Sequence, residues 1–197
     1  EMTLSELQGE VYTLTGRPDQ AARTLLAVRS ATLKLHQMDF FPKDLFETGI
    51  TFSLSAYLQQ LEYRSIIPRW RALKYIRKTD VDQADNLPFL TVITPEQVLD
   101  NYGCNRNDIC YMGAEVINIR SSTELQYILL GCYLNPDVTE TGYSSWIARE
   151  FPYAVVYEAA SEVFRATGRS EEAAEYRRLA AEQRQLILIS NIQQVGY

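Results

Sequence analysis

The spacing of apolar residues changes twice along the chain, and this change constrains the fold more than any other feature of the sequence. At the N-terminal end, apolar residues recur three or four positions apart, which is typical of an amphipathic helix. Over residues 46–54 they alternate with polar residues, as in a strand with one buried face. After Trp146 the helical spacing returns. The sequence therefore predicts an α+β fold in which helices flank a sheet.

The N-terminal part is predicted to be a helical hairpin. Thr3 and Glu6 have the spacing of a capping box, which starts a first helix, and Gly16 is suited to end it. Residues 17–19, Arg-Pro-Asp, predict a turn. A second helix is expected over residues 20–37, because their apolar side chains fall on one helical face.

The middle part is predicted to be an antiparallel β meander. Extended segments are expected over residues 46–54, 69–77, 109–112, 116–120 and 125–134. Turns are expected at Gly113-Ala114 and at Ser121-Ser122, because these small residues favour tight turns. A short capped helix of one to two turns is expected to begin at Thr94 and to end at Gly103.

The C-terminal part is predicted to be a long helical hairpin followed by an extended tail. The first arm spans residues 146–167, Gly168 closes it, and Ser170 caps a second arm that runs to about Ile189. Residues 1–189 then form a single α+β domain, and residues 190–197 form the tail.

Apolar residues at the end of the chain are candidates for partner binding. These are Ile189, Ile192, Val195 and Tyr197. A short tail cannot bury such side chains by itself, so one interpretation is that it docks on a partner surface. The other interpretation is a frayed terminus, which is common in proteins.

The charge balance limits the class of ligand. The formal net charge of -6 argues against a protein that binds nucleic acid through its backbone phosphates. One local exception is the basic run from Arg64 to Lys78. It is a solvated strand that protects a sheet edge, a rim that meets an acidic partner, or a surface near nucleic acid. The candidate rim residues are Arg69, Trp70, Arg71 and Lys74, and Trp70 is either an interface anchor or a core residue.

The sequence lacks the residues that most catalytic and metal sites require. His36 is the only histidine, so we expect no histidine metal site and no catalytic triad, and a surface or capping role for this side chain. The sequence contains no phosphate-binding glycine motif. The three cysteines lack the spacing of a zinc or redox motif, which predicts reduced thiols. No cofactor is expected.

Paired carboxylates leave one enzymatic alternative open, a cell-wall hydrolase. Glu171 with Glu172, or Asp44 with Glu47, are candidates for its acid and base. The first pair is also explained by the preference of a helix N-terminus for negative charge.

Two C-terminal segments resemble a known family. WIAREFPYAVVYEAAS from Trp146 to Ser161 and RATGRSEEAAEY from Arg165 to Tyr176 are similar to the C-terminal helical hairpin of bacteriophage head-to-tail adaptor proteins. The segments around Thr3, Trp70 and Thr94 also follow the order seen in the adaptors of short-tailed phages. A tetratricopeptide-type repeat contains a similar helix pair, but its period would recur, and here the hairpin occurs once.

The resemblance implies a structural virion protein with no enzymatic activity and no cofactor. It implies a homo-oligomeric ring of twelve copies at the neck, assembled in the host cytoplasm, between the portal protein of the capsid and the tail or nozzle proteins. DNA would pass through the lumen without sequence-specific binding, and a negative chain would suit this passage. The C-terminal extension of the family reaches along the portal, which would give Ile189 to Tyr197 a role. No apolar run approaches the ~20 residues of a membrane span, so no membrane partner is expected.

Overall fold

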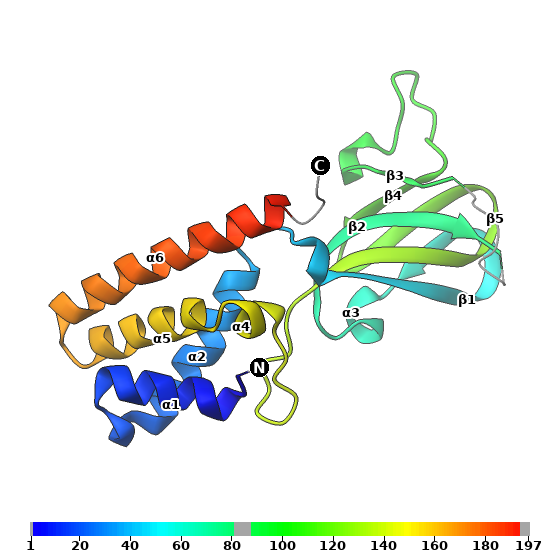
Figure 1. Cartoon of the computed structure of the whole chain (residues 1–197). Helices are drawn as coiled ribbons and strands as arrows, with labels where there is room; N and C mark the ends of the chain where they lie inside the picture. Colours follow the sequence, from blue (N-terminus) through cyan, green and yellow to red (C-terminus); the bar gives the residue numbers. More distant parts are fainter. Residues whose placement is uncertain (1, 81–87, 194–197) are drawn as a thin grey trace. The chain divides into compact units, whose positions relative to one another are not determined.

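The computed structural model describes residues 2–80 and 88–193, and the chain divides into two compact units (Figure 1). We call residues Glu1–Asp44 with Asn135–Tyr197 the helical unit, and Leu45–Leu134 the sheet unit. The sheet unit is thus an insertion in the sequence of the helical one. The expected α+β class is confirmed, with N-terminal helices, a five-stranded sheet and C-terminal helices.

The N-terminal helices are α1 (Leu4–Thr15) and α2 (Ala21–His36). The capping box is confirmed, since the Thr3 hydroxyl accepts the Glu6 N–H and the Glu6 carboxylate accepts the Thr3 N–H. Gly16 ends α1 in the left-handed conformation, with φ of 63°. The predicted turn is a 3-10 turn over Pro18–Gln20, directly followed by α2.

The expected first arm of the C-terminal hairpin is two helices, α4 (Trp146–Glu150) and α5 (Pro152–Ala166). The prediction of one continuous helix is wrong because Pro152 lacks an N–H and disfavours helical geometry at the residue before it. Phe151 accordingly has φ of -132°. Helix α5 has buried residues on several of its sides, among them Ala154, Val155 and Ala159. It therefore forms the centre of the helical unit's core.

Helix α6 (Ser170–Gln193) follows a turn at Gly168, whose φ of 82° confirms the predicted break. Its buried residues, Ala173, Ala180 and Ile187, are seven positions apart and form a narrow stripe. The helix runs past the predicted end near residue 189. The first residues of the expected tail are therefore helical.

The sheet consists of five strands: β1 (Leu45–Leu61), β2 (Trp70–Thr79), β3 (Thr91–Val92), β4 (Ile109–Gly113) and β5 (Val116–Leu134). The expected meander is wrong. Strand β5 is long enough to pair with β1 and, on its other side, with β2 near one end and β4 near the other. Strands β3 and β4 are parallel. An apolar cluster centred on Ile76, Ile128 and Leu130 forms the core of this unit.

The expected turn at Ser121-Ser122 is also wrong, because β5 continues through both residues. Their polar groups are satisfied inside the strand: Asp108 accepts the Ser122 N–H at 3.0 Å, and the Ser121 hydroxyl accepts the Thr123 N–H at 3.2 Å. The turn between β4 and β5 is one position later than expected, at Ala114 and Glu115, with φ of 51° and 63°. The capped helix at Thr94 is a single 3-10 turn, Pro95–Gln97, with the predicted capping box.

Candidate functional site

An exposed apolar strip lies at the C-terminal end of α6. Leu186, Ile189 and Ile192 are 50%, 49% and 76% exposed. They occupy successive turns beside Ile187, which is fully buried. We call these three residues the α6 strip. Of the candidate tail residues, Ile189 and Ile192 therefore lie exposed on a helix, whereas Val195 and Tyr197 lie outside the described residues.

The end of α6 is tied to the segment that follows α2. The Asn191 side-chain amide donates to the Asp39 carboxylate at 3.4 Å, and Leu188 packs on the core of the helical unit. These contacts hold the last turns of the helix in place. The α6 strip is thus presented by an ordered helix, which lowers the entropy lost when a partner covers it.

The candidate rim residues on and beside β2 do not share one environment. Arg69 and Lys74 are exposed, and Arg71 is half-buried. Trp70 is only 7% exposed and packs against Tyr63, with ring centroids 4.5 Å apart. Of the two roles left open by the sequence, the structure places Trp70 in the core of the sheet unit.

A groove of about 560 Å³ opens beside this strand within the sheet unit. It is bordered by α3 (Tyr63–Ile66), the start of β2, the segment around β3, and β4. Its lining is apolar except for two arginines and Thr94, and contains no acidic residue among the described ones. Its lining includes Tyr63, Arg64, Trp70, Arg71, Val92 and Met112.

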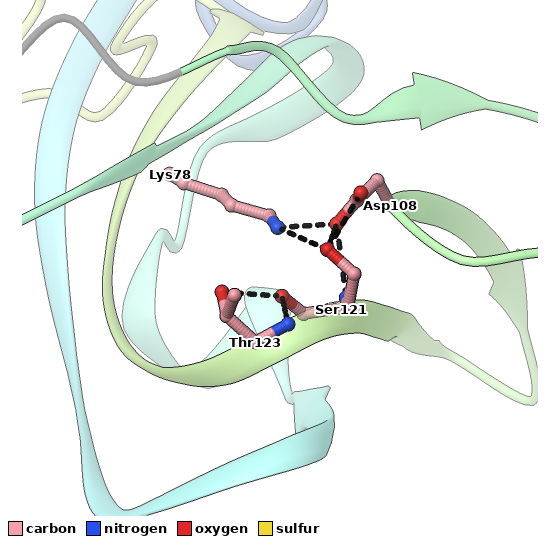
Figure 2. A network of polar contacts seen from close by, with 5 residues as sticks. Lys78, Asp108, Ser121 and Thr123 are labelled. Atoms are coloured by element: carbon pink, nitrogen blue, oxygen red, sulfur yellow. Dashed lines mark hydrogen bonds and ion pairs between the residues drawn. The ribbon is translucent and has the colours of Figure 1, made fainter.

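A buried lysine in the sheet unit joins β2, β4 and β5 (Figure 2). The Lys78 side chain is 8% exposed, and its ammonium pairs with the Asp108 carboxylate. Asp108 precedes β4 in the left-handed region, with φ of 56°, and also accepts from the Ser122 N–H and hydroxyl. Burial opposes the ionisation of Asp108, but the hydrogen bonds from Lys78 and Ser122 lower its pKa from 3.8.

A serine beside a lysine can act as a nucleophile and its base. The Lys78 Nζ lies 3.5 Å from the Ser122 Oγ. The Lys78 Nζ is engaged by the Asp108 carboxylate, however, and the Ser122 hydroxyl donates to that same carboxylate at 2.8 Å and not to the lysine. This network therefore holds three strands together and does not form a nucleophile.

The expectation that one histidine excludes a triad is wrong, because a triad needs only one. His36 is 1% exposed, not at the surface, and its Nε2 lies 2.7 Å from the Ser145 Oγ. Its Nδ1 lies 3.0 and 3.1 Å from the two carboxylate oxygens of Asp44, which also accepts the Trp146 indole N–H at 3.0 Å. These residues come from the ends of α2 and the Pro42–Asp44 turn, and from the start of α4.

This buried arrangement is suited to structure and not to acyl transfer. An imidazole that is 1% exposed cannot reach the leaving group of a substrate, as a general acid must. The Ser145 Oγ also caps α4 by accepting the Ala148 N–H at 3.2 Å. His36, Asp44, Ser145 and Trp146 are hydrogen-bonded to one another. They hold together the end of α2, the Pro42–Asp44 turn and the start of α4.

Three of the four candidate carboxylates of a hydrolase, Asp44, Glu47 and Glu172, are engaged in other contacts. Asp44 is buried beside His36, and Glu47 accepts a hydrogen bond from the Tyr75 hydroxyl. In the first turn of α6, a backbone hydrogen bond and Arg169 lower the pKa of Glu172. A general acid of a glycosidase requires the opposite shift.

Among residues 2–80 and 88–193, no cluster of three or more histidine, cysteine or acidic side chains is arranged to hold a metal ion. Within the same residues, no helix combines the length and apolarity needed to cross a membrane. No protein-family model matches the sequence, and no curated protein matches it either.

Proposed function

We propose that this chain is a structural subunit of the neck of a short-tailed bacteriophage. It forms a ring of twelve copies that binds the portal protein, joins it to the tail proteins and continues the DNA channel. In this arrangement the helices build the ring wall, and the C-terminal end of α6 faces the portal. The net charge of -6 limits adhesion of the DNA that moves through the lumen.

The α6 strip is the observation that carries this proposal. A long helix buries a narrow stripe on its own unit and exposes Leu186, Ile189 and Ile192 on its last turns. Full burial of a fully exposed side chain of this size contributes roughly 1.5–3 kcal/mol, and covering Leu186 or Ile189, which are already half-buried, contributes about half of that. One strip gives a weak contact, but a ring repeats it in every copy, so the total binding is strong.

The test is co-sedimentation of the purified chain with portal rings of the same phage. We expect the chain to sediment with the portal, and Leu186→Asp to weaken this binding by about tenfold to a hundredfold, since it replaces one apolar anchor by a charge. Ala174→Asp is the matched control, because Ala174 is exposed on the same helix several turns earlier.

Two results would contradict the proposal. One is a folded wild-type chain that fails to sediment with the portal. The other is equal binding by Leu186→Asp, Ala174→Asp and the wild type. A cell-wall hydrolase would instead lower the turbidity of purified cell walls, and would lose this activity in Glu47→Gln or in Glu171→Gln with Glu172→Gln.

A further inference from the structure

The exposed face of α6 changes from charged to uncharged within one turn of the helix. Residues 170–184 include seven charged side chains, and residues 185–193 include none. On the exposed face, Glu182 is followed one turn later by Leu186, the first residue of the α6 strip. Solvent favours charged and polar side chains along the whole of such a face, so the change needs another cause.

The charged part of this face is suited to solvent. Arg178 donates to the Glu175 carboxylate at 2.6 Å and to the Glu182 carboxylate at 2.8 Å, and all three side chains are more than half exposed. Ion pairs of this kind are common on solvated helices and contribute little to stability. A partner that covered them would remove water from three charged groups, which costs free energy. A partner's footprint is therefore expected to end before Glu182.

The last charge of α6 is compensated inside the helical unit. Arg184 donates to the Glu158 carboxylate at 2.9 Å, and the Glu158 side chain is only 6% exposed. The end of the helix also contacts Asp39, but it does so through Asn191, which lies about 200° around the helix axis from Ile189. The charges near this end of α6 are thus engaged away from the α6 strip.

The absence of charge limits the kind of surface that can cover the α6 strip. Nucleic acid and anionic lipid both attract helices that carry lysine or arginine. Residues 185–193 carry neither, and the exposed neighbours of the strip on the helix are the uncharged Gln185 and Gln193. A charged protein surface would also lose its water without gaining a counter-charge. The strip is therefore complementary to an uncharged apolar surface of a protein.

A second α6 strip is too small to be that surface. At about 25 cal/mol per Å², burial energies of roughly 1.5–3 kcal/mol correspond to about 60–120 Å² of apolar surface for each fully exposed side chain. With Leu186, Ile189 and Ile192 at 50%, 49% and 76% exposure, one strip offers roughly 100–200 Å². Two strips face to face would bury at most about 400 Å² of apolar surface, whereas stable interfaces bury about 1,200 Å² or more, over half of it apolar.

We infer that the portal protein covers the α6 strip with an uncharged apolar groove that holds α6 from Gln185 to Gln193. This inference rests on the proposed neck function and names the chemistry of the partner surface. The strip residues recur every third position, close to the spacing with which an amphipathic helix fills a groove. A groove also covers the flanks of the helix, so it buries more of each side chain than a second strip would. The segment spans roughly 13 Å at 1.5 Å per residue, which sets the length of the groove.

Substitutions of both signs test whether the groove is uncharged. Ile192→Glu and Ile192→Lys are mixed with portal rings of the same phage, and their dissociation constants are measured by co-sedimentation in about 50 mM and about 500 mM salt. Ala174→Glu and Ala174→Lys are the matched controls, because Ala174 is exposed on the same face of α6, about five turns earlier. Circular dichroism checks that each variant is folded.

We expect both Ile192 variants to weaken the binding about tenfold or more and by similar factors, and both Ala174 variants to bind like the wild type. Salt should change the wild-type affinity by less than about threefold.

Stronger binding by either Ile192 variant would overturn the inference, because it would show that the partner surface is charged. Loss of binding in high salt, or equal weakening by the Ala174 variants, would also overturn it. So would a dimer of the free chain that Ile192→Glu dissociates, or flotation with phospholipid vesicles that Ile192→Glu abolishes. If the wild type still sediments with the portal in these cases, the neck function stands and only the groove fails. A folded wild-type chain that does not sediment with the portal contradicts both.

Discussion

Removing the charge of Asp108 should destabilise the sheet unit more than removing its lysine partner. In Asp108→Asn, the Lys78 ammonium, with a side chain 8% exposed, loses its counter-charge. Removing one member of a buried ion pair leaves the other charge uncompensated, which costs about 3–5 kcal/mol of stability. Asp108 itself is 42% exposed, so water screens part of the pair, and we expect a loss of about 2–3 kcal/mol. Asparagine tolerates the left-handed conformation at this position, which limits the effect to the charge.

The matched variant is Lys78→Met, which keeps the shape of the side chain and removes its charge. Asp108 then retains its hydrogen bonds from Ser122 and its access to solvent, so a loss below about 1 kcal/mol is expected. The double variant should resemble Lys78→Met. Hydrogen exchange of β2 and β5 amides, followed by mass spectrometry, reports the opening free energy of the sheet unit alone.

The pH dependence gives a second readout of the same pair. The folded pKa of Asp108 is lowered from 3.8, so the carboxylate contributes stability that is present above about pH 4 and is lost as the pH falls through the folded pKa. Asp108→Asn should lose this part of the acid sensitivity. Equal losses in Asp108→Asn and Lys78→Met, or less than about 1 kcal/mol in the first, would refute the assignment of a buried charge pair.

Two substitutions and one chemical modification test other parts of the structure. Gly168→Ala forces a side chain into a left-handed conformation with φ of 82°, and should lower the unfolding free energy by about 1–2 kcal/mol in denaturant titration. An unchanged free energy would contradict this. Trp146→Phe removes the indole N–H that Asp44 accepts, and should cost about 1.5–3 kcal/mol in the same titration, whereas a neutral result would contradict a fully engaged His36 network. A thiol reagent near pH 7.5 should modify Cys104 alone in the folded chain and all 3 cysteines after unfolding, and rapid reaction at Cys110 or Cys132 would show that the sheet core is open.

Local signals in the sequence predicted the ends of several elements correctly. The Thr3 and Glu6 capping box, Gly16 and Gly168 act through backbone geometry within a few residues, so the sequence alone is sufficient to find them. The alternation around Ile50 and Phe52 predicted a strand there, and both side chains are buried, but β1 continues to Leu61 and Leu54 is 75% exposed, so the predicted end and much of the predicted buried face are wrong. The capping box and the two glycines do not depend on distant parts of the chain.

Features that depend on distant partners were missed. Ser121 and Ser122 favour a turn, but Asp108, the residue before β4, accepts hydrogen bonds from Ser122, and β5 continues through both serines. His36 meets Ser145 across 109 positions of sequence, and periodicity carries no signal for such a pairing. The break at Phe151 was available from Pro152, whose effect on the preceding residue outweighs the apolar period on both sides.

The candidate site was predictable only in part. The apolar character of Ile189 and Ile192 was visible in the sequence, but their presentation on an ordered helix depends on the contact of Asn191 with Asp39. Exposure of a single side chain is a property of the tertiary structure.

Electron microscopy of portal rings mixed with the purified chain is the most direct test of the neck function. We expect averaged images to show one additional layer of density beneath the portal, with the rotational symmetry of a ring of subunits. Portal rings that look the same with and without the folded chain would contradict the function proposed here.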